Sequence, residues 1–302
     1  MLRSACIETS GRNYFLKALV KKMLPRPVKT RLRRAFVSLS NRYRALVTPS
    51  PAADCEQAAG GLLPPTALQD YVGSDYSRVG EEFFHYFKEL CALRPDESVL
   101  DVGCGSGRMA VPLTSYLSGQ GLYRGFDISP DAIDWCRKNI TPRFPNFNFQ
   151  FTAIHNAAYN TRDTGRASEF RFPFEDQTFD LVFLTSVFTH MLPADMEHYF
   201  SEIARVSKPG ARCLITFFLL NEESTALIDK KMGTYNFEHR AAAYRTIDKE
   251  TPENAVAYDE MFVRGLYEKY GLKVREPIRY GSWCGRKDFL SFQDIVVAER
   301  LR

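Results

Sequence analysis

From about residue 66 onward, short apolar runs alternate with segments of helical periodicity. Apolar runs of about four to eight residues are typical of buried strands, and apolar residues about three or four positions apart are typical of helices. The expected strands are 97–102, 122–127, 147–153, 179–185 and 211–219, with two more near 272–280 and 289–299. The expected helices are 80–92, 107–118, 130–140, 194–206 and 256–270.

This alternation predicts an α/β fold with a doubly wound, mostly parallel, seven-stranded sheet. The last two strands are joined by a loop rather than a helix, so an antiparallel hairpin is expected at one sheet edge. The folded domain is expected to span 66–302.

Residues 1–47 differ from the rest of the chain in charge. They hold twelve Lys or Arg and one acid, Glu8, which leaves 28 of the 40 basic and 35 of the 36 acidic residues for the remainder. Apolar residues recur with helical spacing on both sides of Pro25 and Pro27, so two short basic amphipathic helices are expected. They either bind an anionic membrane surface or pack on the domain, and a cleaved targeting segment or nucleic-acid binding are further alternatives. Because the remainder is acidic, nucleic acid is not the expected partner.

Residues 48–65 are rich in Pro, Ala and Gly and predict a linker. No apolar stretch approaches ~18 residues, so no transmembrane helix is expected. The seven cysteines form no C-x-x-C pair, and the acidic residues and histidines show no metal-ligand spacing, so neither a disulfide framework nor a metal site is expected. A reducing compartment is favoured, and we expect a cytoplasmic protein that is peripheral at the inner membrane surface if the basic arm binds lipid.

The sequence VLDVGCGSG at 99–107 carries three glycines between an expected strand and the next helix. Glycines let the backbone turn sharply there and let a ligand approach it closely. The spacing is G-x-G-x-G rather than the dinucleotide pattern G-x-G-x-x-G, and the preceding Asp101 would repel a phosphate but suits a cationic amine. An oxidoreductase is therefore disfavoured.

Asp127 stands at the end of the next expected strand. A carboxylate there is placed to accept both hydroxyls of a ribose, although capping of the helix that follows is an alternative role. Together with the glycine loop, it indicates an adenosine-containing ligand without a phosphate.

With these motifs in this order, the sequence resembles the class I S-adenosylmethionine-dependent methyltransferases over about 75–299. VLDVGCGSG is similar to the family's first motif and FDIS at 126–129 to its ribose-binding motif. FPFEDQTFDLVFLTSVFTHM at 172–191 is similar to the fourth-strand region, and EIARVSKPGARCLITFFL at 202–219 to the helix, turn and fifth strand that follow. The resemblance implies S-adenosylmethionine as the cofactor.

The resemblance also implies the cofactor contacts. Gly103, Cys104 and Gly105 would lie against its methionine and ribose, Asp127 would bind the ribose hydroxyls, and Ile128 would pack on the adenine. Leu184 and Thr185 would flank the methionyl arm. Where many members carry an acid for the adenine amine, this chain has Ile154, His155 and Asn156, which leaves Ile154 as the candidate contact.

Methyl transfer from a sulfonium requires mainly that nucleophile, methyl and sulfur are aligned. A hydroxyl acceptor needs a base as well. His190, just beyond the fourth expected strand, is the candidate base, with an ordinary pKa near ~6.5; the alternative is that it orders its loop by hydrogen bonding. His155 is a weaker candidate. Cys104 is either a nucleophile or a small residue that fits the loop.

Two segments outside the core are candidate substrate walls: residues 71–80, and residues 232–258, where the resemblance implies a cap. The second segment contains Tyr235, Phe237, His239, Tyr244 and Arg245. Tyr76 and Arg78 either close over the cofactor carboxylate and the acceptor or belong to a surface turn. Trp283 and Arg286 either stack on a sugar or aromatic acceptor or pack at the sheet edge. We expect a small-molecule or glycan acceptor and O-methylation of a glycan, glycolipid or secondary metabolite. The alternative is a scaffold that binds S-adenosylmethionine without catalysis.

Overall fold

The computed structural model describes residues 61–73 and 75–301. The basic arm expected at 1–47, and most of the linker expected at 48–65, lie outside the described residues. The last part of that linker does not behave as a free linker, because Leu62 is buried in the core beside the first described helix, α4 (Thr66–Tyr71).

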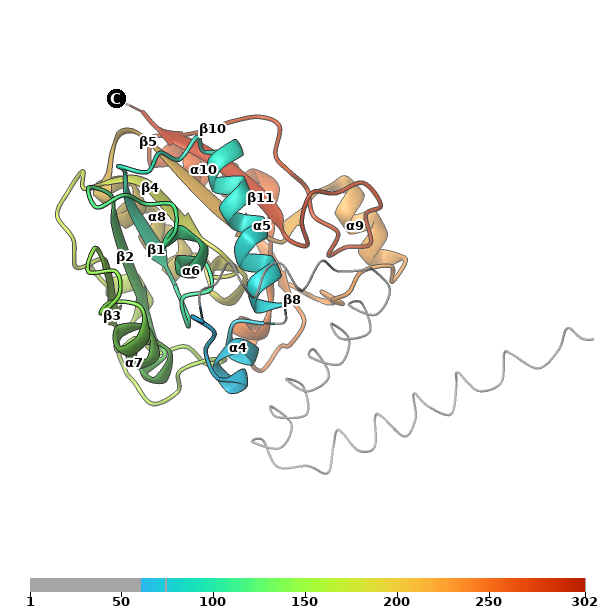
Figure 1. The fold of residues 1–302 in the computed structure, drawn as a ribbon. Helices are drawn as coiled ribbons and strands as arrows, with labels where there is room; N and C mark the ends of the chain where they lie inside the picture. The colour runs from blue at the N-terminus through green and yellow to red at the C-terminus, as the bar shows by residue number, and fades with distance from the viewer. Residues whose placement is uncertain (1–60, 74, 302) are drawn as a thin grey trace, which may run out of the picture. The chain divides into compact units, whose positions relative to one another are not determined.

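A seven-stranded sheet forms the centre of the described domain, in the order β10-β11-β5-β4-β1-β2-β3 (Figure 1). The strands are β1 (Ser98–Val102), β2 (Leu122–Asp127), β3 (Phe147–Phe151), β4 (Phe179–Leu184), β5 (Ser207–Phe217), β10 (Leu272–Val274) and β11 (Asp294–Arg300). The first five pair in parallel, whereas β11 runs antiparallel to both β5 and β10. The expected fold class, with its antiparallel edge pair, is confirmed.

Helices cover both faces of this sheet, and the strand residues alternate accordingly. The helices are α5 (Tyr76–Glu89), α6 (Ala110–Leu113), α7 (Pro130–Asn139), α8 (Pro193–Val206) and α10 (Glu260–Lys269), and the short 3-10 helices are η1 (Ala167–Glu169), η2 (Phe188–His190) and η3 (Pro252–Asn254). Along β4, Leu181 and Phe183 share a core with residues of α5, α6 and α7, while Val182 and Leu184 share one with residues of α8 and α10. Successive side chains of a strand point to opposite faces, so each strand contributes to both cores.

Three of the expected helices are wrong at their boundaries. The helix expected at 80–92 is α5, which spans Tyr76–Glu89. The helix expected at 256–270 begins only at residue 260, because 256–259 form a strand and the Asp259 side chain caps the helix by accepting from the amides of Met261 and Phe262. The helix expected at 107–118 shrinks to the four residues of α6, which contain Pro112, a residue without an amide hydrogen to donate.

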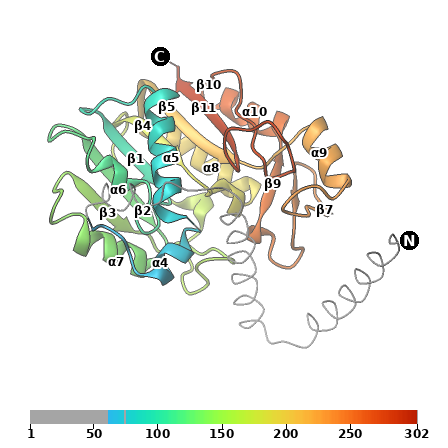
Figure 2. The same cartoon turned by 45° about the vertical axis from the view of Figure 1, so that its right-hand side comes forward.

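A second, smaller sheet follows β5 and was not expected from the sequence. It has the order β6-β9-β8-β7 and is formed by β6 (Leu219–Leu220), β7 (His239–Arg240), β8 (Tyr244–Thr246) and β9 (Val256–Asp259), with α9 (Glu222–Asp229) after its first strand. Figures 1 and 2 show α9 beside the end of the large sheet that carries β11. The cap expected at 232–258 therefore corresponds to most of this small sheet.

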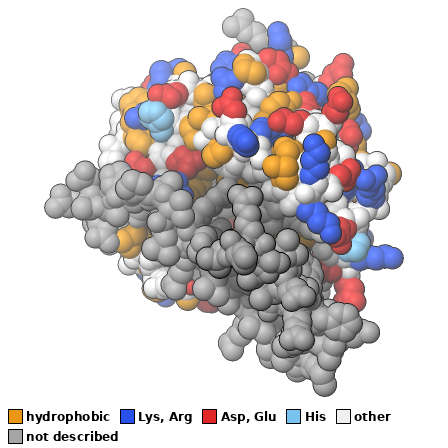
Figure 3. All heavy atoms as spheres, turned by 90° about the vertical axis from the view of Figure 1, so that its right-hand side faces the viewer, with side chains coloured by type: hydrophobic (Ala, Val, Ile, Leu, Met, Phe, Trp, Pro, Cys, Tyr) orange, Lys and Arg blue, Asp and Glu red, His pale blue; other side chains and the backbone are white. Residues whose placement is uncertain are grey.

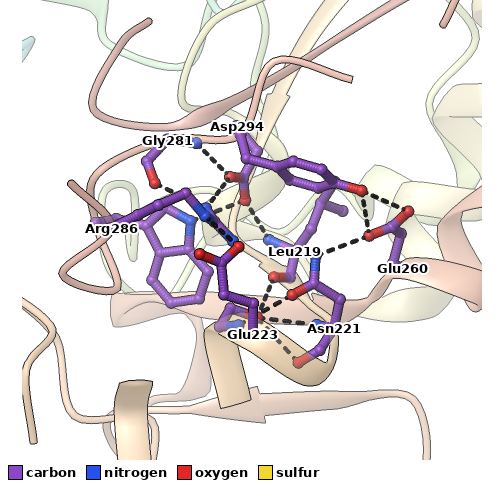
Figure 4. A network of polar contacts seen from close by, with 10 residues as sticks. Leu219, Asn221, Glu223, Glu260, Gly281, Arg286 and Asp294 are labelled. Carbon is purple, nitrogen blue, oxygen red and sulfur yellow. Dashed lines mark hydrogen bonds and ion pairs between the residues drawn. The ribbon is translucent and has the colours of Figure 1, made fainter. Parts of the chain in front are cut away.

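A buried carboxylate, Asp294 at the start of β11, connects the small sheet to the large one (Figure 4). It accepts hydrogen bonds from the amides of Leu219 and Gly281, each at 2.6 Å, and from the indole Nε1 of Trp283 at 2.8 Å. These donors come from β6 and from the loop before β11. One buried charge thus fixes the small sheet, the loop and β11 together.

This arrangement decides between the alternatives for Trp283 and Arg286. Trp283 is 0% exposed and packs against Phe218 and Phe237, with ring centroids 5.1 and 5.5 Å apart. Arg286 is also buried and donates from Nε to Glu223 at 2.7 Å. The packing alternative therefore describes both residues, because their side chains are used in packing and internal hydrogen bonds.

The described surface carries charges of both signs. On the face drawn in Figure 3, Lys and Arg side chains are interspersed with Asp and Glu. Within residues 61–73 and 75–301, no helix is long and apolar enough to cross a membrane, and no group of three or more His, Cys, Asp or Glu is arranged to hold a metal ion.

Candidate active site

The glycine loop after β1 is tied to the end of β2. The amides of Gly103 and Cys104 both donate to the carbonyl of Phe126, at 2.9 and 3.0 Å. Gly103, Gly105 and Gly107 have φ values of 77°, 52° and 79°, a region that strains residues with a side chain. The sequence therefore needs glycine at these positions for the loop to turn at the carboxyl edge of the sheet.

The carboxylate of Asp127 is aimed at this loop. It is 7% exposed and accepts from the Gly105 amide at 2.8 Å, the Ser129 amide at 2.8 Å and the Tyr71 hydroxyl at 3.0 Å. Capping of α7 is performed by Ser129, whose hydroxyl accepts from the Ala132 amide. Asp127 is therefore free of the capping role, and it already accepts a hydroxyl in the way a ribose would require.

Asp101, at the end of β1, is fully buried and only half satisfied. One carboxylate oxygen accepts from the Tyr123 hydroxyl at 2.5 Å, while Oδ1 has no hydrogen-bond partner. Burial raises the pKa of this carboxyl to about 7, against the lowering effect of the Tyr123 hydrogen bond. An unpaired buried oxygen of this kind fits a ligand that brings a donor, such as the ammonium of an amino acid.

Cys104 lies under the loop rather than in an open cleft. A Cβ added to Gly125 would be 2.9 Å from its sulfur, so the thiol is enclosed between the loop and β2. Burial raises the pKa of this thiol well above its usual range. The thiolate is disfavoured, which argues against Cys104 as a nucleophile and for a residue chosen by size.

The remaining expected cofactor contacts lie around the same edge. Ile154 and Leu184 are buried members of the core shared with α8 and α10, and Ile128 packs against that core. Thr185 is half-buried directly after β4.

The loop is covered by the segment around the end of α4. A Cβ on Gly105 would collide with Val72, and one on Gly103 would be 2.5 Å from Val187. Tyr76 is buried and donates to the carbonyl of Ser106 at 2.7 Å, so it holds this cover to the loop. Arg78 lies in the first turn of α5 rather than in a surface turn. Its side chain is 58% exposed and pairs with Asp75.

His190 is held in one orientation by both ring nitrogens. Its Nδ1 is 2.9 Å from the carbonyl oxygen of Glu253 in η3, and its Nε2 is 3.2 Å from the hydroxyl of Tyr159. Because a carbonyl can only accept, Nδ1 carries the proton and Nε2 accepts from the hydroxyl. Burial lowers the pKa of this imidazole below its ordinary value, so the ring is neutral near pH 7.

A row of side chains leads from the ribose-type carboxylate to this histidine. The Tyr71 hydroxyl contacts Asp127, the Tyr71 and Tyr159 rings meet edge to face with centroids 5.8 Å apart, and the Tyr159 and His190 rings do so at 4.8 Å. The candidate base and the candidate cofactor loop therefore share one site.

The sequence alone missed Tyr71, Tyr159 and the carbonyl of Glu253. Both tyrosines lie in or next to segments that the sequence already placed at the border of the site. Their position in the chain was the signal that could have identified them. No signal in the sequence could identify the Glu253 carbonyl, since every residue has a backbone carbonyl. His155, the weaker candidate base, approaches the carbonyl of Asp163 instead, at 3.1 Å.

A turn after β4 completes the site. Ser186 has φ of 62°, and its amide donates to the Thr216 hydroxyl at 2.8 Å. Gln293 accepts from Thr216 at 2.6 Å and donates to the Ser186 hydroxyl at 3.0 Å. These bonds stabilise a strained residue directly before Val187, the residue that lies on Gly103.

Comparisons with known proteins agree with this geometry. A family model described as a methyltransferase domain matches residues 100–215. The chain is 36% identical over 82 residues to the aklanonic acid methyltransferase DauC of Streptomyces sp. (strain C5), which is 26% of this chain and 37% of that protein. It is 32% identical over 133 residues to the uncharacterized methyltransferase sll0829 of Synechocystis sp., which is 43% of this chain and 52% of that protein.

Among solved structures, the PH0226 protein from Pyrococcus horikoshii OT3 has a similar fold. The TM-score is 0.53 with 20% sequence identity, over 78% of this chain and 95% of that one. The two curated relatives are matched over about half of their length or less, so the similarity concerns the domain described above.

The buried carboxyl of Asp101 predicts a pH dependence of stability. Because its folded-state pKa is raised from 3.8 to about 7, it stabilises the fold fully below about pH 4, and this contribution is lost as pH rises through about 7. Asp101→Asn should remove up to about 4 kcal/mol of this dependence while it keeps an acceptor for Tyr123. Denaturant unfolding of both proteins between pH 4 and 8, a range set by these two pKa values, measures the difference. Parallel pH profiles for the two proteins would contradict the assignment.

Proposed function

The described domain belongs to the class I S-adenosylmethionine-dependent methyltransferase family, and we propose that this protein transfers a methyl group from that cofactor to an oxygen atom of a glycan, glycolipid or secondary metabolite. The observation that supports an oxygen atom as the methyl acceptor is the environment of His190. A neutral imidazole with its proton fixed on Nδ1 offers Nε2 to a hydroxyl, and the Tyr159 hydroxyl already makes that contact.

The cofactor residues fit this activity. The cofactor supplies a methyl group on an activated sulfonium leaving group. For their part, Asp127 accepts hydroxyl hydrogen bonds, the unpaired Oδ1 of Asp101 suits an ammonium, and the glycine loop gives access to the backbone. Gly103, Cys104, Gly105, Ile128, Ile154, Leu184 and Thr185 are proposed as the remaining contacts.

A hydroxyl must lose its proton as its oxygen attacks, and His190 is proposed to take it. His190 can accept this proton because burial keeps the ring neutral, and because the hydrogen bond to the Glu253 carbonyl keeps the ring proton on Nδ1 and leaves Nε2 unprotonated. Such an acceptor would replace the Tyr159 hydroxyl at Nε2. An amine or a thiolate acceptor would not need this arrangement.

We also propose that the arm formed by residues 1–47 attaches the protein to the anionic cytoplasmic surface of the inner membrane. The support is the sequence: twelve basic residues against one acid, with two amphipathic helical patterns. A membrane location would suit a glycolipid acceptor, whose lipid part stays in the bilayer.

The first test is cofactor binding. Asp127→Ala removes an acceptor of charge-assisted hydrogen bonds worth about 1.5–3 kcal/mol each, so affinity for S-adenosylmethionine should fall at least about tenfold. Calorimetry measures it, with Asp131→Ala, an exposed acid in the first turn of α7, as the matched control. Binding of NAD in place of S-adenosylmethionine would overturn the proposal.

The second test concerns His190. His190→Ala should slow methyl transfer by ~10²–10⁴-fold and leave cofactor affinity unchanged. Since burial lowers the pKa of His190 below its ordinary value of ~6.5, the wild-type rate should be constant above about pH 6.5 and fall only at more acidic pH.

His85→Ala, at an exposed position on α5, is the control and should keep the wild-type rate. Labelled cofactor incubated with lipid and glycan fractions identifies the acceptor. A wild-type protein that binds the cofactor but labels no fraction would favour the scaffold alternative.

The third test removes the arm. Deletion of residues 1–47 should leave cofactor affinity intact, because every cofactor residue lies in the described domain. Co-sedimentation with anionic vesicles should lose its salt-sensitive part. If the shortened protein still pellets with the same salt dependence, the membrane proposal fails.

A further inference from the structure

The edge of the large sheet at β3 carries a cavity that lies apart from the candidate cofactor residues. β3 is the last strand at this edge, and α7 lies beside it (Figure 1). The cavity has a volume of about 710 Å³, within the range of roughly 300–1,000 Å³ of small-molecule sites. The lining side chains that matter for its chemistry come from β2, α7, β3 and the loop before β4: Arg124, Arg137, Asn148, Gln150, Phe151 and Phe174.

The charge of this cavity is positive. Among the described residues that line it there are two arginines and no Asp or Glu, and no ion pair within the described chain includes Arg124 or Arg137. Other half-buried or buried arginines of the domain are paired with acids: Arg205 with Glu202, Arg212 with Glu97 and Arg264 with Glu260. The two charges in the cavity are therefore not neutralised by a protein carboxylate, and they attract anions.

Both guanidinium groups are held in place by backbone carbonyls. Nη1 of Arg124 donates to the carbonyls of Tyr123 and Asn146, at 2.9 and 3.1 Å, and Nε of Arg137 donates to the carbonyl of Phe149 at 2.8 Å. Burial lowers the pKa of Arg124, and no carboxylate acts against this shift. Because these bonds use one nitrogen of each group, the other nitrogens are left to a ligand whose binding sites are already oriented.

The two arginines reach the cavity from opposite faces of the sheet. Phe126, two positions after Arg124 on β2, belongs to the core shared with α8 and α10, so Arg124 points to that face. Ile133 and Cys136 of α7 belong to the core on the other face, and Arg137 follows them. Since β3 is an edge strand, Arg137 can reach around it to the same cavity. An anion there meets donors from two sides.

The other lining side chains narrow the class of anion. Asn148 and Gln150 are exposed on β3 and carry amide groups that can donate to further oxygen atoms. Phe151 and Phe174 are half-buried and offer apolar ring surface, on which a planar base can stack. A ligand that carries several acceptor oxygens and a flat ring uses all of these groups.

We propose that this cavity binds a nucleoside phosphate, with Arg124 and Arg137 on the phosphate and the two phenylalanines against the base. Guanidinium groups pair with phosphate oxygens through two parallel hydrogen bonds, which a lysine would not provide. The site shares no residue with the cofactor contacts, so this inference does not rest on the proposed function.

The test uses the full-length protein saturated with S-adenosylhomocysteine, which fills the candidate adenosine site. Calorimetry at about pH 8, above the second phosphate pKa of ~6, compares uridine 5′-monophosphate with uridine and with inorganic phosphate. We expect uridine 5′-monophosphate to bind at least about tenfold more tightly than either part alone. Arg124→Gln and Arg137→Gln should each weaken its binding by about 10- to 100-fold and leave the affinity for S-adenosylhomocysteine unchanged.

Arg166→Gln, at an arginine whose side chain is 74% exposed and pairs with Glu169, is the matched control and should bind uridine 5′-monophosphate like wild type. The inference is overturned if wild-type protein does not bind uridine 5′-monophosphate, if inorganic phosphate binds as tightly, or if both arginine variants keep wild-type affinity for it. Equal losses of affinity for S-adenosylhomocysteine would mean that the arginines only support the fold, which also overturns it.

If Arg124→Gln does not fold, the result for Arg137→Gln decides, because that side chain is exposed. Wild-type protein that fails to bind S-adenosylhomocysteine would contradict the proposed function alone, since the cavity and the cofactor site have no residue in common.

Discussion

The active-site edge depends on the hydrogen bonds that Asp127 accepts. Its carboxylate joins the glycine loop after β1, the start of α7 after β2 and the helix α4 that covers both. These segments are distant in sequence, and they meet because the strand order reverses beside β1. The carboxylate is buried, so each of these bonds forms in a medium of low dielectric constant, where it is stronger than at the surface.

The buried charges of the domain fall into two groups that differ in their partners. Asp294 accepts from two backbone amides and an indole, and although burial raises its pKa to about 6, its donors satisfy both oxygens. Asp101 and Arg108 each retain a buried atom with no partner. The first arrangement is what a structural tether needs, because it is complete without a ligand. The second leaves a carboxylate oxygen and a guanidinium nitrogen without partners among the described residues, as is also true of Nη2 of Arg286 beside Asp294.

The small sheet after β5 contributes to the chemistry through its position. Through η3 it supplies the Glu253 carbonyl that fixes the proton on Nδ1 of His190, and its strand β9 supplies Tyr258, whose hydroxyl donates to the Met191 carbonyl at 2.5 Å. Asp294 in turn holds β6 to the large sheet. The protonation state of the candidate base therefore depends on an element that lies outside the parallel sheet.

The sequence by itself determined the parallel sheet and placed the glycine loop, Asp101, Asp127 and His190 at or just beyond the carboxyl ends of its strands, because these positions follow from periodicity. It did not determine the small sheet, whose two- to four-residue strands are too short to show a period. It left Trp283 undecided, since an indole can stack on a ligand or fill a core, and only burial against Phe218 and Phe237 separates the two. It did not reveal the contacts of Tyr71 and Tyr159 or the unpartnered Nε of Arg108. Those depend on which side chains meet across segments distant in the chain, and tertiary packing alone decides that.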